Sequence, residues 1–203
     1  MKKQFIFKPS YLFWLIPLAA LGVVCALFEW EILYFIQNNL RSSFFDAFFS
    51  KITLLGELAI CWFAWAIVLL FFKKYRKNAV VLIIGILLGA LVGNLILKHA
   101  VARPRPCWID GSVSLLIENP SDFSFPSGHT LSSVIAAVIL TLTDKRFGCF
   151  AIPLAFIQSF SRLYLFVHFP TDIYGGLMIG LLIGFATYLV SRNILKKKFN
   201  SSL

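Results

Sequence analysis

Long apolar runs dominate this sequence and restrict the folds open to it. Hydrophobic residues make up 59% of the 203 residues, and charged residues only 14%. Several runs approach the roughly 20 apolar residues that an α-helix needs to cross a bilayer. A segment inside a bilayer must also satisfy its backbone hydrogen bonds internally, which favours helices. The sequence therefore predicts an all-α integral membrane protein with one domain over residues 1–203.

Six apolar runs are interpreted as transmembrane helices. An even number of spans would place both termini on the same side of the membrane. The first two spans lie within 11–72, and the other four lie within 79–190. The expected spans are 11–28, 53–72, 79–98, 130–143, 147–166 and 172–190.

The segment 29–51 between the first two spans combines many phenylalanines with charged residues. Two interpretations remain open for it. It is either an amphipathic helix lying in the membrane interface or an ordinary hydrophobic loop.

The basic residues indicate an orientation. The net charge is +10, but the lysines and arginines lie between the spans and not in a soluble basic patch, so no nucleic-acid partner is expected. Of the 19, 13 fall in the N-terminus, the segments 73–77 and 144–146, and the C-terminal tail, which would share one side. By the positive-inside rule this side is cytoplasmic. We expect a multi-pass protein of the cell membrane (plasma or inner membrane), with both termini in the cytoplasm.

Two of the expected spans carry glycine at every fourth position. Small residues at this spacing allow helix backbones to approach closely in lipid. We therefore expect close helix packing along both series, Gly85, Gly89 and Gly93 in the third span and Gly176, Gly180 and Gly184 in the sixth.

Three clusters of polar residues would lie at the outer membrane face. Lys98, Arg105 and Arg162 offer a cationic cradle that suits a phosphoryl group with its charge spread over several oxygens. Each of them could instead extend to the lipid head groups, as basic residues at helix ends usually do. For Arg103 we adopt this second interpretation.

The other two clusters add a helix N-terminus and an imidazole. Ser127 and Gly128 directly precede the expected fourth span, and the free N–H groups of such a terminus bind phosphate. A plain N-cap beside a surface histidine, His129, is the alternative. His168 could act as a nucleophile, with its tautomer fixed by Asp172.

The three clusters together match a known family pattern. The pattern reads Lys, six residues, Arg-Pro; then Pro-Ser-Gly-His; then Ser-Arg, five residues, His, three residues, Asp. It corresponds here to 98–106, 126–129 and 161–172, with every defining position matched. The second half of the chain thus resembles the type 2 phosphatidic acid phosphatase (PAP2) superfamily, which shares its site with vanadium haloperoxidases and bacterial acid phosphatases.

The resemblance implies a helical core with six spans and phosphate chemistry without metal or other cofactor. It makes His168 the nucleophile that forms a phosphohistidine, Asp172 its hydrogen-bond partner, and His129 the acid that protonates the leaving oxygen. Few acids other than Asp172 are expected at the outer face. Asp110, Glu118 and Asp122 are interpreted as solvated loop residues. Glu57 is a minor candidate for substrate contact, and the alternative is that it packs in the protein or extends to the head groups. The phosphoryl oxygens would be held by Lys98, Arg105, Ser127, Gly128 and Arg162.

The expected substrate is a membrane lipid phosphate, because the site would lie at the membrane–water boundary. A compact protein with an extracytoplasmic site resembles bacterial undecaprenyl-diphosphate phosphatases, which act on the carrier lipid of the cell wall. Phosphatidylglycerol phosphate and phosphatidic acid are alternative substrates. A lipid phosphotransferase, and a transporter or scaffold with an anion site, are the alternative functions. The sequence leaves the oligomeric state open.

Overall fold

The computed structural model describes residues 10–200, and the side chains of 16–194. All regular structure within residues 10–200 is helical, as the sequence predicts. The elements, in chain order, are α1 (Ser10–Leu27), α2 (Glu29–Asn39), α3 (Ser43–Ile52), η1 (Thr53–Ala59), α4 (Ile60–Leu70), α5 (Arg76–Gly89), η2 (Ala90–Leu97), α6 (Lys98–Val101), α7 (Pro106–Ile109), α8 (Gly128–Thr143), α9 (Lys145–Tyr164) and α10 (Pro170–Asn200).

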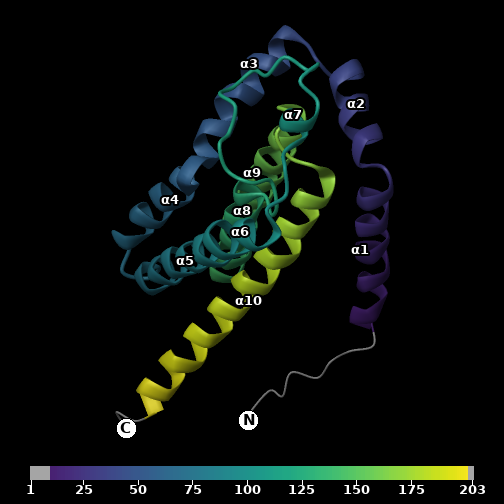
Figure 1. Cartoon of the computed structure of the whole chain (residues 1–203). Coiled ribbons are helices and arrows are strands. Elements are labelled where there is room, and N and C mark those ends of the chain that lie inside the picture. Colours follow the sequence, from purple (N-terminus) through teal and green to yellow (C-terminus); the bar gives the residue numbers. More distant parts are fainter. Residues whose placement is uncertain (1–9, 201–203) are drawn as a thin grey trace.

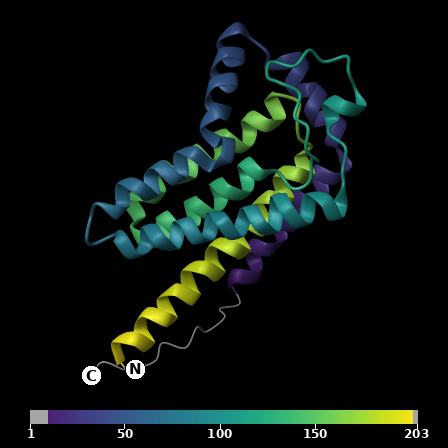
Figure 2. The same ribbon diagram turned by 60° about the vertical axis from the view of Figure 1, so that its left-hand side comes forward.

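α8 is the central helix, and it packs against α5, α9 and α10 (Figures 1 and 2). Both glycine series face it. A Cβ atom added to Gly89 of α5 would lie 2.5 Å from Ile135, and one added to Gly180 of α10 would lie 2.8 Å from Val134. These separations leave no room for a side chain. The predicted close packing along both glycine series is therefore confirmed, and it fixes α5 and α10 against the helix that begins at the second motif.

The predicted number of spans is not confirmed. Within residues 10–200, three helical stretches are long and apolar enough to cross a bilayer, and a fourth is added if α1 and α2 count as one span bent by 78°. α8 has only 16 residues. α9 has 20 residues, but its buried side carries polar residues such as Gln158, Ser161 and Arg162. A helix that turns polar side chains toward the protein interior has a low mean hydropathy, so length and composition do not identify it as a span.

The second predicted span differs in its start. The sequence predicts a start at residue 53, but the helical stretch begins at Ser43 and reaches Leu70 with a break in η1. Residues 29–51 accordingly form helices α2 and α3 and not a loop. The placement of these helices in the membrane interface stays a prediction.

Two irregular stretches interrupt the helices on either side of α8. In η1, Glu57 has an extended ψ of 131°, and Leu58 and Ala59 have positive φ angles of 47° and 57°. η2 is a π-helix, the wider form that occurs frequently at functional sites. Inside a bilayer, irregular backbone is tolerated where it borders a cavity or is buried in protein. The position of η1 and η2 thus predicts a cavity between them.

The described ends of the chain point away from α7. In Figure 1, α1 begins at the lower right and α10 ends at the lower left, whereas α7 lies near the top. The placement of both termini on one side of the membrane stays a prediction. The N-terminal lysines of the orientation argument, Lys2, Lys3 and Lys8, lie outside the described residues.

Replacing Gly180 by valine should destabilise the protein, because the new side chain would overlap Val134 and the backbone oxygen of Leu131. Such overpacking typically costs about 1–3 kcal/mol. We expect a lower midpoint of thermal unfolding in detergent micelles. Gly111→Val is the matched control, since nothing lies within 4 Å of a Cβ atom there. Equal midpoints for the two variants would contradict the packing described here.

Candidate active site

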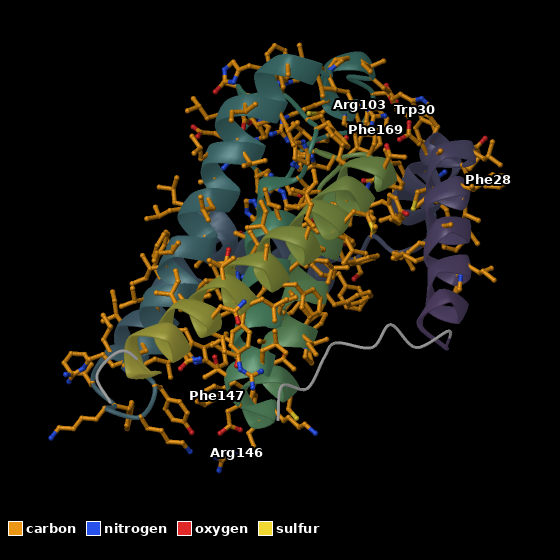
Figure 3. All side chains as sticks on the ribbon, turned by 90° about the horizontal axis from the view of Figure 1, so that it is seen from below. Phe28, Trp30, Arg103, Arg146, Phe147 and Phe169 are labelled. Atoms are coloured by element: carbon orange, nitrogen blue, oxygen red, sulfur yellow. The ribbon has the colours of Figure 1, made fainter. Side chains whose placement is uncertain are left out.

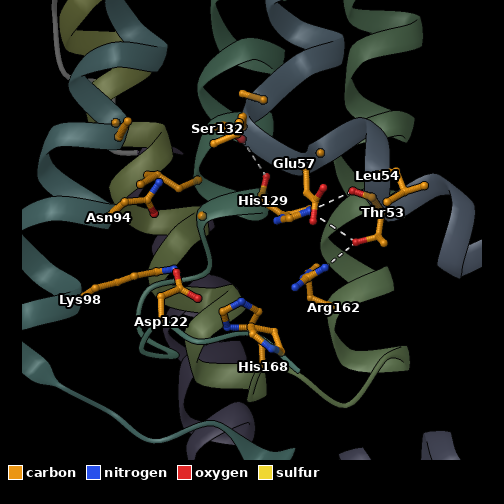
Figure 4. Close-up of a pocket in the computed structure, with 18 of the residues that line it drawn as sticks. Thr53, Leu54, Glu57, Asn94, Lys98, Asp122, His129, Ser132, Arg162 and His168 are labelled. Atoms are coloured by element: carbon orange, nitrogen blue, oxygen red, sulfur yellow. Dashed lines mark hydrogen bonds and ion pairs between the residues drawn. The ribbon is translucent and has the colours of Figure 1, made fainter. Parts of the chain in front are cut away.

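A cavity of about 990 Å³ lies between η1 and η2 at the start of α8 (Figure 4). Side chains from all three motifs line it. Ser127 and Asp172 are fully buried next to these lining residues. The structure therefore brings together all eight site residues expected from the sequence, and those that line the cavity directly are Lys98, Arg105, Gly128, His129, Arg162 and His168.

His168 is held between an acceptor and a donor. Its Nδ1 lies 3.4 Å from Oδ2 of Asp172, and its Nε2 lies 3.1 Å from Nη1 of Arg105. A guanidinium can only donate, so Nε2 carries the lone pair and Nδ1 carries the proton. Burial, reinforced by the positive charges of Arg105 and Arg162, holds the pKa of His168 well below its usual range. The imidazole is therefore neutral at pH 7, and its Nε2 lone pair accepts from Arg105 at the wall of the cavity.

Asp172 is a buried carboxylate with several partners. The amide N–H of Phe169 donates to its Oδ2 at 2.7 Å, and the Ser124 hydroxyl donates to the same oxygen. Arg103 donates to Oδ1 at 2.8 Å. An unpaired buried charge would cost several kcal/mol, so these contacts allow Asp172 to stay ionised beside His168.

Arg103 does not extend to the lipid head groups, which corrects the interpretation from sequence. Besides Asp172 it binds Glu29 of α2 at 2.7 Å, and its guanidinium lies 4.1 Å from the centre of the Phe169 ring. Trp30 in turn packs edge-on against Phe169 (Figure 3). Arg103 therefore connects α2 to the carboxylate that orients His168.

Ser127 is the N-cap of α8. Its Oγ accepts from the Thr130 N–H at 3.4 Å, and its own N–H donates to the Asp172 carbonyl at 3.1 Å. Gly128 packs so closely on Asn94 that a Cβ atom would lie 2.8 Å from the amide oxygen. Ser127 therefore caps α8, and the N-terminus of this 16-residue helix lies at the edge of the cavity. His129 lines the cavity and is not the surface histidine of the alternative interpretation. Phosphate binding at this terminus stays a prediction.

Thr53 of η1 joins two residues expected at the site. His129 Nε2 lies 3.0 Å from the Thr53 carbonyl oxygen, which fixes the proton on Nε2 because a carbonyl only accepts. The Thr53 hydroxyl accepts from Nη1 of Arg162. Nε of Arg162 is buried and has no hydrogen-bond partner in the described part of the chain. A buried, unsatisfied guanidinium N–H at a cavity wall fits a site for an anion.

Asp122 is not merely a solvated loop residue. Its carboxylate bridges two cations of the cradle, with Oδ1 2.6 Å from Nη2 of Arg105 and Oδ2 paired to Nζ of Lys98. Burial opposes ionisation, but the two cations outweigh it and lower the pKa of Asp122 to about 2. Of the other loop acids, Glu118 lines the cavity while Asp110 accepts a hydrogen bond from Tyr34. Glu57 also lines the cavity.

Two residues at the site are hard to find from sequence. Thr53 lies in an apolar run with no motif, and the only signal for Arg103 is its place two residues before Arg105. No group of three or more His, Cys, Asp or Glu side chains within residues 10–200 is arranged to hold a metal ion.

Comparison with known proteins identifies the family. The model of the PAP2 superfamily matches residues 78–196. The undecaprenyl-diphosphatase of Sulfolobus acidocaldarius is 32% identical over 143 residues, which cover 70% of this chain and 69% of that protein.

Two solved structures resemble the helical arrangement over most of the chain. The crystal structure of Aquifex aeolicus LpxE has a TM-score of 0.68 at 29% identity, covering 78% of this chain and 93% of that one. The crystal structure of the first transmembrane PAP2 type phosphatidylglycerolphosphate phosphatase from Bacillus subtilis has a TM-score of 0.65 at 26% identity, covering 92% and 94%. The chain belongs to the PAP2 superfamily, and like these relatives it is a phosphatase.

Proposed function

We propose that this chain hydrolyses a membrane lipid phosphate or diphosphate through a phosphohistidine at His168, without a metal ion. The observation that carries the proposal is the neutral imidazole of His168, whose Nε2 lone pair faces a cavity lined by Lys98, Arg105 and Arg162. A nucleophile with one fixed tautomer and a preorganised set of cations are the two requirements of such a reaction.

In the first step, Nε2 of His168 attacks the phosphorus atom and the bond to the leaving oxygen breaks. Arg105 Nη1 is 3.1 Å from Nε2, so it is already at the place where a phosphoryl oxygen would arrive. Lys98, Arg162, the Ser127 hydroxyl and the Gly128 N–H would share the remaining charge. The imidazolium that forms keeps its Nδ1 proton, and Asp172 stabilises the positive charge.

His129 serves as the acid in this step and as the base in the next. In the substrate complex His129 would act as the imidazolium, next to the negative charge of the phosphate. Its Nε2 proton passes to the leaving oxygen and leaves a neutral imidazole, which then takes a proton from the water that attacks the phosphohistidine. The second step releases orthophosphate and restores the neutral imidazole of His168 and the imidazolium of His129. In the ligand-free protein Thr53 holds this proton by its carbonyl oxygen, and a substrate oxygen would replace that acceptor.

The substrate is proposed to be undecaprenyl diphosphate, which would be converted to undecaprenyl phosphate. The cavity has an apolar side formed by Leu54, Leu58, Phe63 and Leu87, and Leu58 is 88% exposed, so a lipid chain could remain in the bilayer while its phosphate reaches the cations. The relative named undecaprenyl-diphosphatase supports this choice. In this proposal one domain spans the cell membrane six times, with both termini in the cytoplasm and the site extracytoplasmic.

Phosphatidylglycerol phosphate is the main alternative, favoured by the likeness to the Bacillus subtilis phosphatase structure. Phosphatidic acid and transfer of the phosphoryl group to a second lipid follow the same chemistry.

Phosphate release by the purified protein in detergent micelles containing EDTA tests the proposal. We expect faster turnover of undecaprenyl diphosphate than of phosphatidylglycerol phosphate or phosphatidic acid. The His168→Ala variant should lose at least about 1,000-fold of the rate, because it lacks the nucleophile. Preference for a glycerolipid would replace the proposed substrate, and complete inhibition by EDTA or a nearly normal rate in His168→Ala would refute the mechanism.

In the first turnover, before the phosphohistidine is hydrolysed, the His129→Gln variant should slow release of the leaving group from a lipid monophosphate far more than release of nitrophenolate from p-nitrophenyl phosphate. An alkoxide needs a proton in order to leave, whereas nitrophenolate does not. Thr53→Val keeps the carbonyl that accepts from His129 and removes the hydroxyl that accepts from Arg162, so it should lower both rates and leave their ratio unchanged, and Thr53→Ser should retain the normal rates. Equal losses on the two substrates in His129→Gln would exclude the acid role.

A further inference from the structure

The Asp122 carboxylate occupies a place that the proposed reaction needs. Its two oxygens bridge Lys98 and Arg105, as two oxygens of a phosphoryl group would. The loop that carries it connects α7 to α8, and its side chain is 54% exposed. The carboxylate thus lies over the cationic cradle from the solvent side, next to His168 (Figure 4).

Arg105 is fully engaged in this arrangement. Its Nε donates to the Asp122 carbonyl at 2.7 Å, Nη1 donates to the Val167 carbonyl at 2.7 Å and to His168, and Nη2 donates to the Asp122 carboxylate. A phosphoryl group can bind Arg105 only if some of these acceptors withdraw. The carbonyls belong to the backbone, whereas the Asp122 carboxylate ends a half-exposed side chain that can rotate into water.

We propose that Asp122 is a resident anion of the phosphate site, which the substrate phosphate displaces and which returns to help expel orthophosphate. This inference rests on the proposed function, because it concerns the same cavity.

Charge explains both directions of the exchange. The three cations Lys98, Arg105 and Arg162 repel one another in an empty site, and a carboxylate that is ionised at neutral pH offsets part of this repulsion. A phosphoryl group with two negative charges attracts the cations more strongly than one carboxylate does, so it enters. After hydrolysis, the same carboxylate competes with orthophosphate, whose dissociation would otherwise be slow from a site with three unopposed cations.

A different role for Asp122 predicts the opposite sign. If its carboxylate stays in place and merely orients Lys98 and Arg105 for the substrate, then removing its charge would loosen the cradle and weaken phosphate binding. If it is a competitor, then removing its charge would strengthen binding. The sign of the change in affinity therefore separates the two roles.

The experiment measures the dissociation constants of orthophosphate and orthovanadate by calorimetry, with the whole protein in micelles that contain EDTA. We expect Asp122→Asn and Asp122→Ala to bind both anions about tenfold more tightly than the unaltered protein does. Two different replacements are used so that a folding defect in one does not decide the result, and thermal unfolding checks each. We also expect stronger product inhibition by orthophosphate in both variants.

Two control variants lie in the same loop. Asp110→Asn makes the same chemical change at a carboxylate that accepts from Tyr34 and from the Ser112 N–H, and its affinities should not change. Glu118→Gln removes a charge from the cavity lining, and it should tighten binding much less than Asp122→Asn does.

Unchanged or weaker anion binding in the Asp122 variants would overturn the inference and leave the proposed function intact. Equal tightening in Glu118→Gln would also overturn it, because the effect would then be one of overall charge. If the unaltered protein binds neither anion and releases no phosphate from any lipid, the proposed function itself fails.

Discussion

The contact between Asp172 and Nδ1 of His168 is the interaction on which the rest of the site depends. It fixes the tautomer that leaves Nε2 free for attack, and it requires a carboxylate that stays charged although it is fully buried. The cost of burying that charge explains why Arg103, Ser124 and the Phe169 N–H all converge on it. Asp172, with its charge compensated by these three donors, thus holds His168 in a single orientation.

The helices around the cavity are irregular where they meet the site. η1 carries Thr53, whose carbonyl oxygen contacts His129, and η2 leads directly into Lys98. Both lie at the cavity, where irregular backbone is tolerated within a membrane protein. The glycine series position these segments, because they allow α5 and α10 to approach α8 without intervening side chains.

Sequence reasoning found the residues whose spacing is local. His168 and Asp172 are four residues apart, Ser127 and Gly128 directly precede α8, and each motif could be read within a short stretch. It failed for contacts over long separations. Arg103 has no partner within the motifs, so the sequence assigns it to the lipid head groups; its partners in the structure, Asp172 and Glu29, are 69 and 74 residues away. Asp122 reads from sequence as a solvated loop residue, because its ion pairs form only when the loop folds back over the cavity.

Hydropathy was also an incomplete guide to the fold. The apolar runs predicted an all-helical chain, and the helices appear near the expected residues, but α9 carries Gln158 and Arg162 toward the interior. A helix in the core of a membrane protein can therefore be less apolar than one that faces lipid. This is the physical reason that length and composition leave the count of six spans unconfirmed.

The central claim, a covalent intermediate at His168, can be tested by rapid quenching. The protein would be mixed with a lipid diphosphate that carries a radiolabelled terminal phosphate and denatured in alkali within the first turnover, and the labelled peptide would be sequenced. The account predicts label on His168, stable in alkali and lost in acid, and none in His168→Ala. Full turnover of the substrate with no label on the protein, or label on another residue, would contradict it.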